Sequence, residues 1–156
     1  MLEVKFYDTV DDSLLKFAVI ISQSNGKWVF CKHKERDTYE VPGGHREAGE
    51  NILETAKREL QEETGAIKFD IKLVCVYSVT GKTRVNDTGE ESFGGLYFAE
   101  ISEFAKELHS EMEKVVLMDE LPDNWTYPLI QPKLIEKYLQ IERQTYSKIQ
   151  LAQSKL

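Results

Sequence analysis

The chain has 156 residues, 41% of them hydrophobic and 30% charged, which suits one soluble globular domain with a sizeable core. Its net charge of −7 argues against a general nucleic-acid or membrane-surface binder, because such proteins present a basic surface. A phosphate-bearing substrate is not excluded, since a bound metal ion can supply the missing positive charge.

The two cysteines, Cys31 and Cys75, each lie in or at the end of an apolar run. Two are too few for a disulfide framework, and a free cysteine is among the most buried residue types. No signal-peptide core follows Met1, and no run approaches the ~18 apolar residues of a membrane-spanning helix. We therefore expect a cytoplasmic monomer or homodimer with two buried thiols and neither a DNA nor a membrane partner.

The first forty residues are expected to form strands. Residues 1–10 alternate enough for an edge strand, and residues 14–22 form an apolar, β-branched run typical of a central strand. Residues 24–26, Ser-Asn-Gly, predict a turn, after which residues 27–31 return as the second strand of a hairpin. Residues 39–42 then run extended toward two glycines.

A glycine-bounded helix is predicted between residues 43 and 65. Gly43 and Gly44 precede it, Glu50 starts it where a carboxylate suits the positive end of the helix dipole, and Gly65 stands just past its end. Apolar residues recur at helical spacing and are expected to share the buried face: Ile52, Leu53, Ala56 and Leu60.

Strands and a loop follow this helix. Residues 68–79 predict a strand, residues 81–92 a polar, turn-rich loop, and residues 93–101 a further strand. Alternation along the first of these strands predicts that four side chains share one face: Ile71, Leu73, Cys75 and Tyr77.

The last third of the chain predicts a short helix over residues 104–113, a strand over residues 115–118 and a helix over residues 128–151, with Pro132 in an early turn. A mixed sheet with one helix inside the chain and one near its end makes the predicted fold class α+β, as a three-layer α/β/α sandwich. We expect a single domain spanning residues 1–156.

Three glutamates of the central helix are close neighbours. Glu59, Glu62 and Glu63 stand at positions i, i+3 and i+4, and like charges at this spacing destabilise a helix. A hard divalent cation such as Mg²⁺, which proteins hold through a few carboxylates and substrate phosphates, would offset the repulsion. A lone cluster of this kind is more often a solvated acidic face, so the surrounding pattern has to decide.

The surrounding pattern favours the metal site. Residues 44–65 read G-x5-E-x7-R-E-L-x-E-E-x-G, and at ordinary residue frequencies such a match has a probability on the order of 10⁻⁹ per window. The segment resembles the signature box of the Nudix hydrolases, here residues 44–66. The box usually ends in a bulky aliphatic residue; Ala66 stands there instead, a departure in packing rather than in a ligand.

The Nudix resemblance implies an α/β/α sandwich and a pyrophosphohydrolase that uses Mg²⁺ or Mn²⁺. It also implies that Glu59, Glu62 and Glu63 hold the metal ions together with the Gly43 carbonyl. One glutamate, Glu62 or Glu59, would take a proton from the attacking water, and Arg58 would orient the carboxylates. Oxygen ligands suit these ions, whereas zinc prefers sets of Cys and His.

A further carboxylate is expected outside the box. In the MutT-like branch of the family it ends a strand about three dozen residues later, and the match here is Glu100. Strand alternation places Glu100 on the same face as Leu96 and Phe98. Glu90 and Glu91, in the loop before that strand, are the alternatives.

Residues on either side of the helix are candidates for substrate binding. Gly44, His45 and Glu50 lie around its start, and His45 is equally well explained as a solvated loop histidine. Trp125 and Tyr127 could stack on a base, although such aromatics more often anchor a helix in the core.

The MutT-like branch reads its purine with an asparagine just before the final helix. The candidates here are Asn124 and Thr126, so the base preference stays open.

The resemblance implies a small-molecule nucleotide substrate, most simply a nucleoside triphosphate, including an oxidised purine nucleotide, cleaved to monophosphate and pyrophosphate. RNA 5′-pyrophosphate removal and nucleotide-sugar hydrolysis are alternatives within the class. A nucleotide-sensing regulatory module usually has a damaged box or an attached DNA-binding unit, whereas this box keeps every glutamate. A purely structural protein would have no reason to concentrate uncompensated carboxylates.

Overall fold

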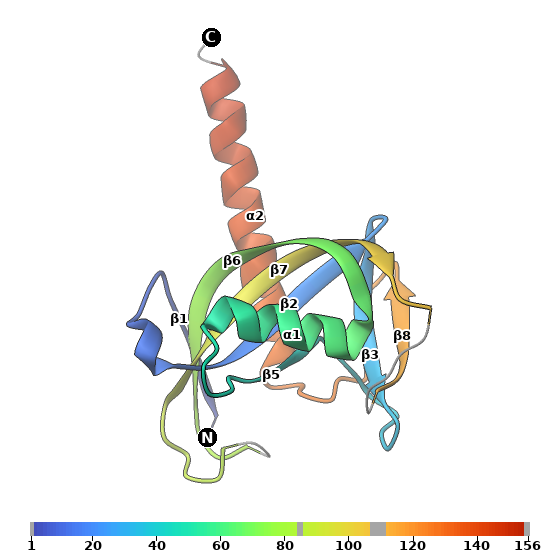
Figure 1. Cartoon of the computed structure of the whole chain (residues 1–156). Helices are drawn as coiled ribbons and strands as arrows, with labels where there is room; N and C mark the ends of the chain where they lie inside the picture. The colour runs from blue at the N-terminus through green and yellow to red at the C-terminus, as the bar shows by residue number, and fades with distance from the viewer. Residues whose placement is uncertain (1, 84–85, 107–111, 155–156) are drawn as a thin grey trace.

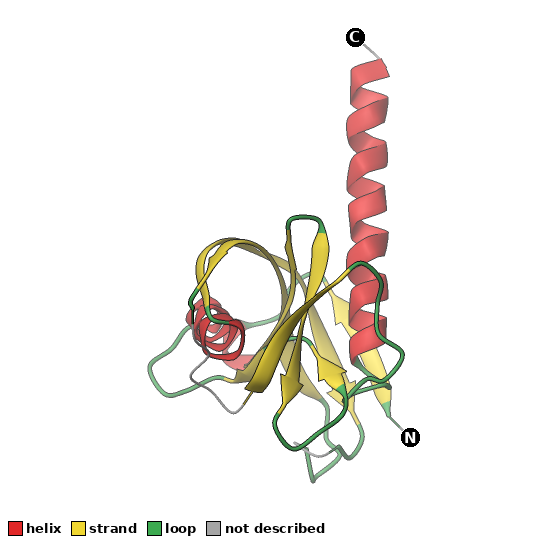
Figure 2. Ribbon diagram, turned by 90° about the vertical axis from the view of Figure 1, so that its right-hand side faces the viewer, coloured by secondary structure: helices red, strands yellow, loops and turns green. Residues whose placement is uncertain are grey.

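Two helices cover opposite faces of a mixed sheet in the computed structural model, which describes residues 2–83, 86–106 and 112–154 (Figures 1 and 2). The strands are β1 (Glu3–Tyr7), β2 (Leu15–Ser24), β3 (Lys27–His33), β4 (Tyr39–Glu40), β5 (Gly43–His45), β6 (Ala66–Thr80), β7 (Ser92–Phe104) and β8 (Met112–Met118). A 3₁₀ turn, η1 (Asp12–Leu14), precedes β2, and the helices are α1 (Ile52–Thr64) and α2 (Gln131–Ser154).

The order of the strands makes the sheet mixed. They run β1-β6-β7-β2-β3-β4, with β5 added to β2 and β8 added to β3. The central pair, β2 and β7, is parallel, whereas the other pairings are antiparallel. The predicted α+β class with a mixed sheet and two main helices is therefore confirmed.

Each helix closes its own hydrophobic core. Helix α1 buries Ile52, Ala56 and Leu60 against one face of the sheet, in a cluster that includes Tyr97. Helix α2 packs on the other face, where the Tyr138 ring stacks on Phe98 at 4.5 Å between centroids. Because successive strand residues point to opposite faces, Tyr97 and Phe98 of β7 serve different cores, and the predicted three layers follow.

Helix α1 has well-defined ends. The Asn51 side chain accepts a hydrogen bond from the Glu54 N–H at 2.8 Å, and Glu54 accepts one from the Asn51 N–H at 3.2 Å. The sequence had predicted a helix start at Glu50, but this capping box starts the helix after Asn51. Gly65 ends it in the left-handed conformation, with φ at 75°.

The buried face of α1 differs from the prediction at one position. Leu53, expected in the core, is exposed, whereas Thr55 is buried and donates a hydrogen bond to Glu50 at 2.9 Å. The buried face is therefore turned toward the segment that precedes the helix.

Strand β6 does not present one uniform face. Its pairing with β7 shifts register between Leu73 and Cys75, and such a bulge reverses the alternation of side chains. Ile71 consequently packs with the α1 core, Leu73 is exposed, and Cys75 and Tyr77 face the α2 core. The prediction that these four share a face was wrong.

Two other boundaries differ from the sequence prediction. Strand β7 continues through Phe104 and β8 begins at Met112, while residues 107–111 of the predicted short helix lie outside the described residues. Helix α2 runs three residues later than expected at each end, and its later turns extend away from the sheet (Figure 1). No helix in the described part of the chain has the length and apolarity to cross a membrane.

Candidate active site

Arg58 centres a charge network on one flank of α1. Its guanidinium donates to Glu50 at 2.7 Å, to Glu59 at 2.7 Å, to Glu62 at 3.5 Å and to the His45 carbonyl at 3.0 Å. Hydrogen bonding to Arg58 lowers the pKa of Glu50 to about 2, and Glu50 in turn raises that of Arg58. Glu50, predicted as a substrate contact, therefore ties the preceding loop to the helix.

Glu63 and Glu59 form a close pair of carboxyl groups. Glu63 is 8% exposed and accepts a hydrogen bond from the Gly43 N–H at 3.1 Å. Burial, together with hydrogen bonding to Glu59, raises the pKa of Glu63 to about 9, despite the opposing effect of the Gly43 N–H. Two carboxyls in contact cannot both carry charge without compensation, so they need either a shared proton or a cation.

The double glycine before α1 allows this close approach. A Cβ on Gly44 would lie 2.3 Å from the Glu59 carboxylate, and one on Gly43 would lie 2.8 Å from the Ala18 carbonyl oxygen of β2. Any side chain at Gly44 would force Glu59 away from the β5 backbone. The glycines thus bring the strand and the glutamates together.

The donor set fits a hard divalent cation. Glu59 and Glu63 present oxygen atoms side by side, and Glu62, with its side chain 54% exposed, lies on the same flank. Within the described ranges, no three acidic, histidine or cysteine side chains already converge as a metal site, because Arg58 draws Glu59 and Glu62 toward itself. A cation would compete with Arg58 for these two groups.

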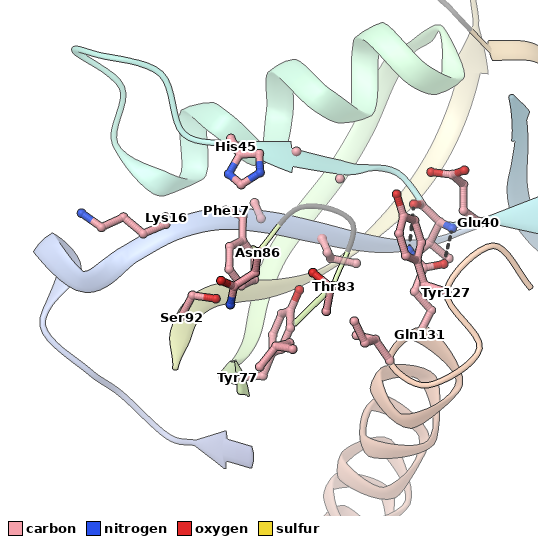
Figure 3. Close-up of a pocket in the computed structure, with 17 residues that line it drawn as sticks. Lys16, Phe17, Glu40, His45, Tyr77, Thr83, Asn86, Ser92, Tyr127 and Gln131 are labelled. Carbon is pink, nitrogen blue, oxygen red and sulfur yellow. Dashed lines mark hydrogen bonds between the residues drawn. The ribbon is translucent and has the colours of Figure 1, made fainter. Parts of the chain in front are cut away.

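A cavity of about 350 Å³ begins beside the double glycine and extends toward the start of α2 (Figure 3). Its lining includes Gly43, Gly44 and His45, the Phe17 ring that meets the His45 ring edge-on at 6.3 Å between centroids, and the Tyr77 ring beyond Phe17. The Phe17 and Tyr77 rings meet edge to face at 5.5 Å between centroids. The cavity therefore has a polar end near the glutamates and an aromatic end.

Gln131, the first residue of α2, fixes one wall of this cavity. Its side-chain amide accepts from the Val41 N–H at 3.0 Å and donates to the Val41 carbonyl at 3.5 Å. These two bonds, drawn dashed in Figure 3, hold the helix start against the strand that leads to Gly43. Sequence reasoning missed Gln131, Phe17 and Tyr77 as site residues, because nothing in their local patterns links them to the distant glutamates.

Trp125 and Tyr127, the aromatic pair before α2, have different roles. Tyr127 lines the cavity, whereas Trp125 packs edge-on against Phe30 at 5.4 Å, which is the core-anchor role. Thr126 shares a hydrogen bond with Thr38 at 2.7 Å. Of the three predicted contacts, the structure brings only Tyr127 to the cavity.

Glu100 lies apart from the box glutamates. It is exposed, and alternation puts it on the Phe98 face of β7, near Tyr138 on α2, whose pKa is raised mainly by burial and to a small extent by the charge of Glu100. The box glutamates approach from the opposite, α1 side, and β7 continues past Glu100 to Phe104. The structure therefore does not bring Glu100 to the predicted metal site.

Among the described residues, neither loop alternative has a hydrogen bond or ion pair with a glutamate of the box. Glu91 accepts hydrogen bonds from Tyr7 at 2.9 Å and from Ser78 at 2.7 Å, which lower its pKa and tie it to β1 and β6. Glu90 is exposed.

Glu40 is a buried acid that sequence reasoning did not single out. It lies in β4 opposite Cys31, is 7% exposed and pairs with Arg36 at 3.4 Å. Its charge contributes to the raised pKa of Glu63, while the Cys31 thiol donates to the Glu63 carbonyl at 3.4 Å. Glu40 thus adds negative charge beside the box from outside it.

Comparison with known proteins gives the family. A model of the NUDIX domain matches residues 13–138. The Bacillus subtilis protein named "Putative 8-oxo-dGTP diphosphatase YtkD" is 35% identical over 123 residues, which cover 78% of this chain and 73% of that protein.

Solved structures of Nudix-type enzymes also match this chain. The Bacillus subtilis pyrophosphohydrolase BsRppH, in a mutant form, matches with a TM-score of 0.74 and 28% identity, covering 92% of this chain and 90% of that one. A C. elegans Ap4A hydrolase shares the fold, with a TM-score of 0.60, 15% identity and coverage of 85% and 99%.

The fold and the glutamate flank therefore define a Nudix hydrolase, an enzyme that acts on phosphoric anhydride bonds. This chain belongs to the NUDIX family, and its box falls inside the matched residues. Enzymes of this family act on small nucleotide substrates and generally use divalent metal ions.

Proposed function

We propose that the protein is a divalent-metal-dependent pyrophosphohydrolase that cleaves a nucleoside triphosphate to the monophosphate and pyrophosphate, with Mg²⁺ or Mn²⁺. The observation that carries this is the contact of the paired Glu59 and Glu63 carboxyls with Gly44 and Gly43, two residues that line a cavity which also holds aromatic side chains. A nucleotide has matching parts, because its polyphosphate needs cations and its base needs flat apolar walls.

In this proposal, Glu59, Glu62 and Glu63 hold the metal ions, with the Gly43 carbonyl as a further oxygen donor. A bound Mg²⁺ supplies charge neutralisation for the phosphate oxygens and polarises the attacked phosphorus. Arg58 keeps Glu59 in place through the 2.7 Å hydrogen bond, so we assign it to positioning the carboxylates.

Glu62 is our choice for the proton acceptor, with Glu59 as the alternative. Its carboxylate is exposed, whereas Glu63 is buried and Glu59 is held by Arg58. As the water oxygen bonds to phosphorus, the anhydride P–O bond breaks, the bridging oxygen leaves with pyrophosphate, and the water proton passes to Glu62.

Among nucleoside triphosphates, we propose dGTP and its oxidised form as the first candidates, and the 35% identity to YtkD supports this choice. The two candidate base readers, Asn124 and Thr126, both have partners within the protein. Thr126 is bonded to Thr38, and the Asn124 amide donates to the Asp37 carbonyl at 2.7 Å.

We also propose that residues 1–156 form one domain. Strand β1 pairs with β6, and the first half of α2 packs on the same sheet, which supports this organisation. The cytoplasmic location and the monomeric or homodimeric state remain predictions.

A substrate panel tests the function. Purified protein is mixed with dGTP, 8-oxo-dGTP, the other dNTPs, a 5′-triphosphate RNA and a nucleotide sugar, with Mg²⁺ or Mn²⁺, and the products are separated by chromatography. We expect monophosphate and pyrophosphate from a dNTP, and no turnover in excess chelator. Turnover that persists in chelator, or that needs zinc alone, contradicts the metal assignment. Cleavage of the RNA alone favours the 5′-end alternative, and cleavage of nothing favours a sensing module.

A further inference from the structure

Tyr77 presents an unusual hydroxyl at the aromatic end of the cavity. The residue is 2% exposed and lines the cavity, and Figure 3 shows its ring directed from β6 into that space. Within the described part of the chain, no group forms a hydrogen bond with this hydroxyl. By contrast, the hydroxyls of Tyr7 and Tyr138 donate to Glu91 and Glu142, each at 2.9 Å. The Tyr77 ring is buried, but its hydroxyl opens into the cavity, where a bound ligand could supply the partner in place of solvent.

The ring that carries this hydroxyl is held rigidly. Tyr77 pairs with Phe6 of β1 on one side and Gly94 of β7 on the other, so its backbone lies inside the sheet. The Phe17 ring packs against the Tyr77 ring. Gly94 leaves room for the Phe17 ring, since a Cβ at position 94 would overlap it. Burial raises the pKa of the Tyr77 phenol, so the group stays an O–H donor at neutral pH.

The surroundings of the hydroxyl suit an uncharged, planar group. Phe17, Val79 and Tyr127 contribute apolar surface to the lining, while the Gln131 amide is occupied by the Val41 backbone. Thr83, Asn86 and Ser92 add polar side chains to the same lining, and aromatic walls with O–H and N–H donors suit a ring that carries a carbonyl oxygen.

We propose that Tyr77 is a specificity-determining residue whose hydroxyl donates a hydrogen bond to a carbonyl oxygen of the nucleobase. Guanine, cytosine, thymine and uracil carry such an oxygen, and adenine does not. The inference rests on the proposed function, because it places the polyphosphate at Gly43 and Gly44 and hence the base at the aromatic end. A site with a buried donor rejects a ligand that cannot accept from it, because the donor is then left unpaired.

Tyr77→Phe is the sharpest test, because it removes the hydroxyl and keeps the ring contact with Phe17. Since that hydroxyl has no described partner in the ligand-free protein, the melting temperature should not fall. The substrates are dGTP and the triphosphate of 2-aminopurine deoxyriboside, a purine without the 6-carbonyl, followed by dTTP and dATP. We expect kcat/KM to fall roughly tenfold to a hundredfold for dGTP and dTTP and to stay unchanged for the other two.

Tyr138→Phe is the matched control. It removes a hydroxyl that is bonded to Glu142 on α2 and does not line the cavity, so it should leave the order of base preference unchanged. Equal losses across all four substrates in Tyr77→Phe would place the hydroxyl against the sugar and overturn the proposal. Unchanged kinetics on all four would overturn it as well.

A binding measurement separates this inference from the proposed function. Calorimetric titration of dGMP and dAMP into the wild type and Tyr77→Phe, in chelator, needs no turnover. Weaker dGMP binding in the variant, with dAMP binding unchanged, supports the Tyr77 assignment even if no triphosphate is hydrolysed. Turnover of triphosphates with the same base preference in both proteins leaves the function standing and rejects the role of Tyr77.

Discussion

The two ends of the cavity are built on different physical principles. At the carboxylate end, made of Gly43, Gly44, Glu59 and Glu63, charged hydrogen bonds dominate, and Arg58 holds Glu59 at 2.7 Å. At the aromatic end, made of Phe17 and Tyr77, neutral contacts dominate, such as the 5.5 Å contact between the two rings.

The difference shows which groups at each end need a ligand to complete their interactions. The carboxylate end gathers more negative charge than its arginine compensates, and burial together with the neighbouring carboxyls raises the pKa of Glu63 to about 9. At the aromatic end, the Tyr77 hydroxyl has no hydrogen-bond partner among the described residues. Changes at the first end should therefore alter catalysis, metal dependence and pH dependence, whereas changes at the second should alter the choice of base.

The largest effect is expected from Glu62→Gln. If Glu62 accepts the water proton, kcat should fall by about 10²–10⁴-fold, while the melting temperature stays level because this side chain is exposed. Steady-state kinetics with the best dNTP and a thermal melt make the measurement. Lys57→Gln, an exposed change on the same helix, is the control and should leave kcat unchanged. A Glu62→Gln enzyme with wild-type kcat would move the role to Glu59.

Arg58→Ala should lower both activity and stability. It removes charged hydrogen bonds to Glu50, Glu59 and the His45 carbonyl, so we expect the free energy of unfolding to fall by about 2 kcal/mol. Urea unfolding with and without Mg²⁺ measures the loss. Arg58→Lys keeps the charge but lacks the planar guanidinium, so its free energy of unfolding should lie between those of the wild type and Arg58→Ala. An Arg58→Ala protein as stable as the wild type would show that the network contributes nothing to the fold.

The metal-free protein should lose stability as pH rises. In the folded state the pKa of Glu63 is about 9, against an ordinary 4.5, so the folded state binds one more proton than the unfolded state between these values. The contribution of Glu63 to the free energy of unfolding should therefore be highest below about pH 4.5. It should then decline by at most ~1.4 kcal/mol per pH unit toward pH 9.

Melts in chelator across this range test the effect, and Glu63→Gln, which cannot ionise, should flatten the decline. A wild-type decline that persists in Glu63→Gln would assign it to another group.

The smallest effect is expected from Glu100→Gln. Because Glu100 is exposed on the α2 side, the change should alter stability by no more than about 0.5 kcal/mol. It should also leave the Mg²⁺ titration of activity unchanged. A raised Mg²⁺ requirement in this variant would show that the two ends of the cavity do not contain the whole metal site.

The carboxylate end could be predicted from the sequence because one continuous segment builds it. Helical spacing alone places Glu59, Glu62 and Glu63 on one flank, and the double glycine marks a close backbone approach. The strands and both main helices were also predictable from hydrophobic periodicity, apart from their ends.

The aromatic end could not be predicted, because β2 and β6 meet there only after folding. The β6 bulge reverses alternation between Leu73 and Cys75, a change that no local pattern announces. Alternation correctly put Glu100 with Phe98, but it could not show that this face packs on α2 rather than α1.

Direct metal binding tests the central claim, that the paired carboxyls of Glu59 and Glu63 hold a divalent cation. Mn²⁺ is titrated into the substrate-free protein at neutral pH and followed by electron paramagnetic resonance, with proton release measured by calorimetry in two buffers. We predict that the wild type binds Mn²⁺ and releases about one proton, since the pKa of Glu63 is about 9 before binding. The Glu59→Gln, Glu63→Gln double variant should bind at least about tenfold more weakly. Equal Mn²⁺ affinity in the folded double variant would contradict the account.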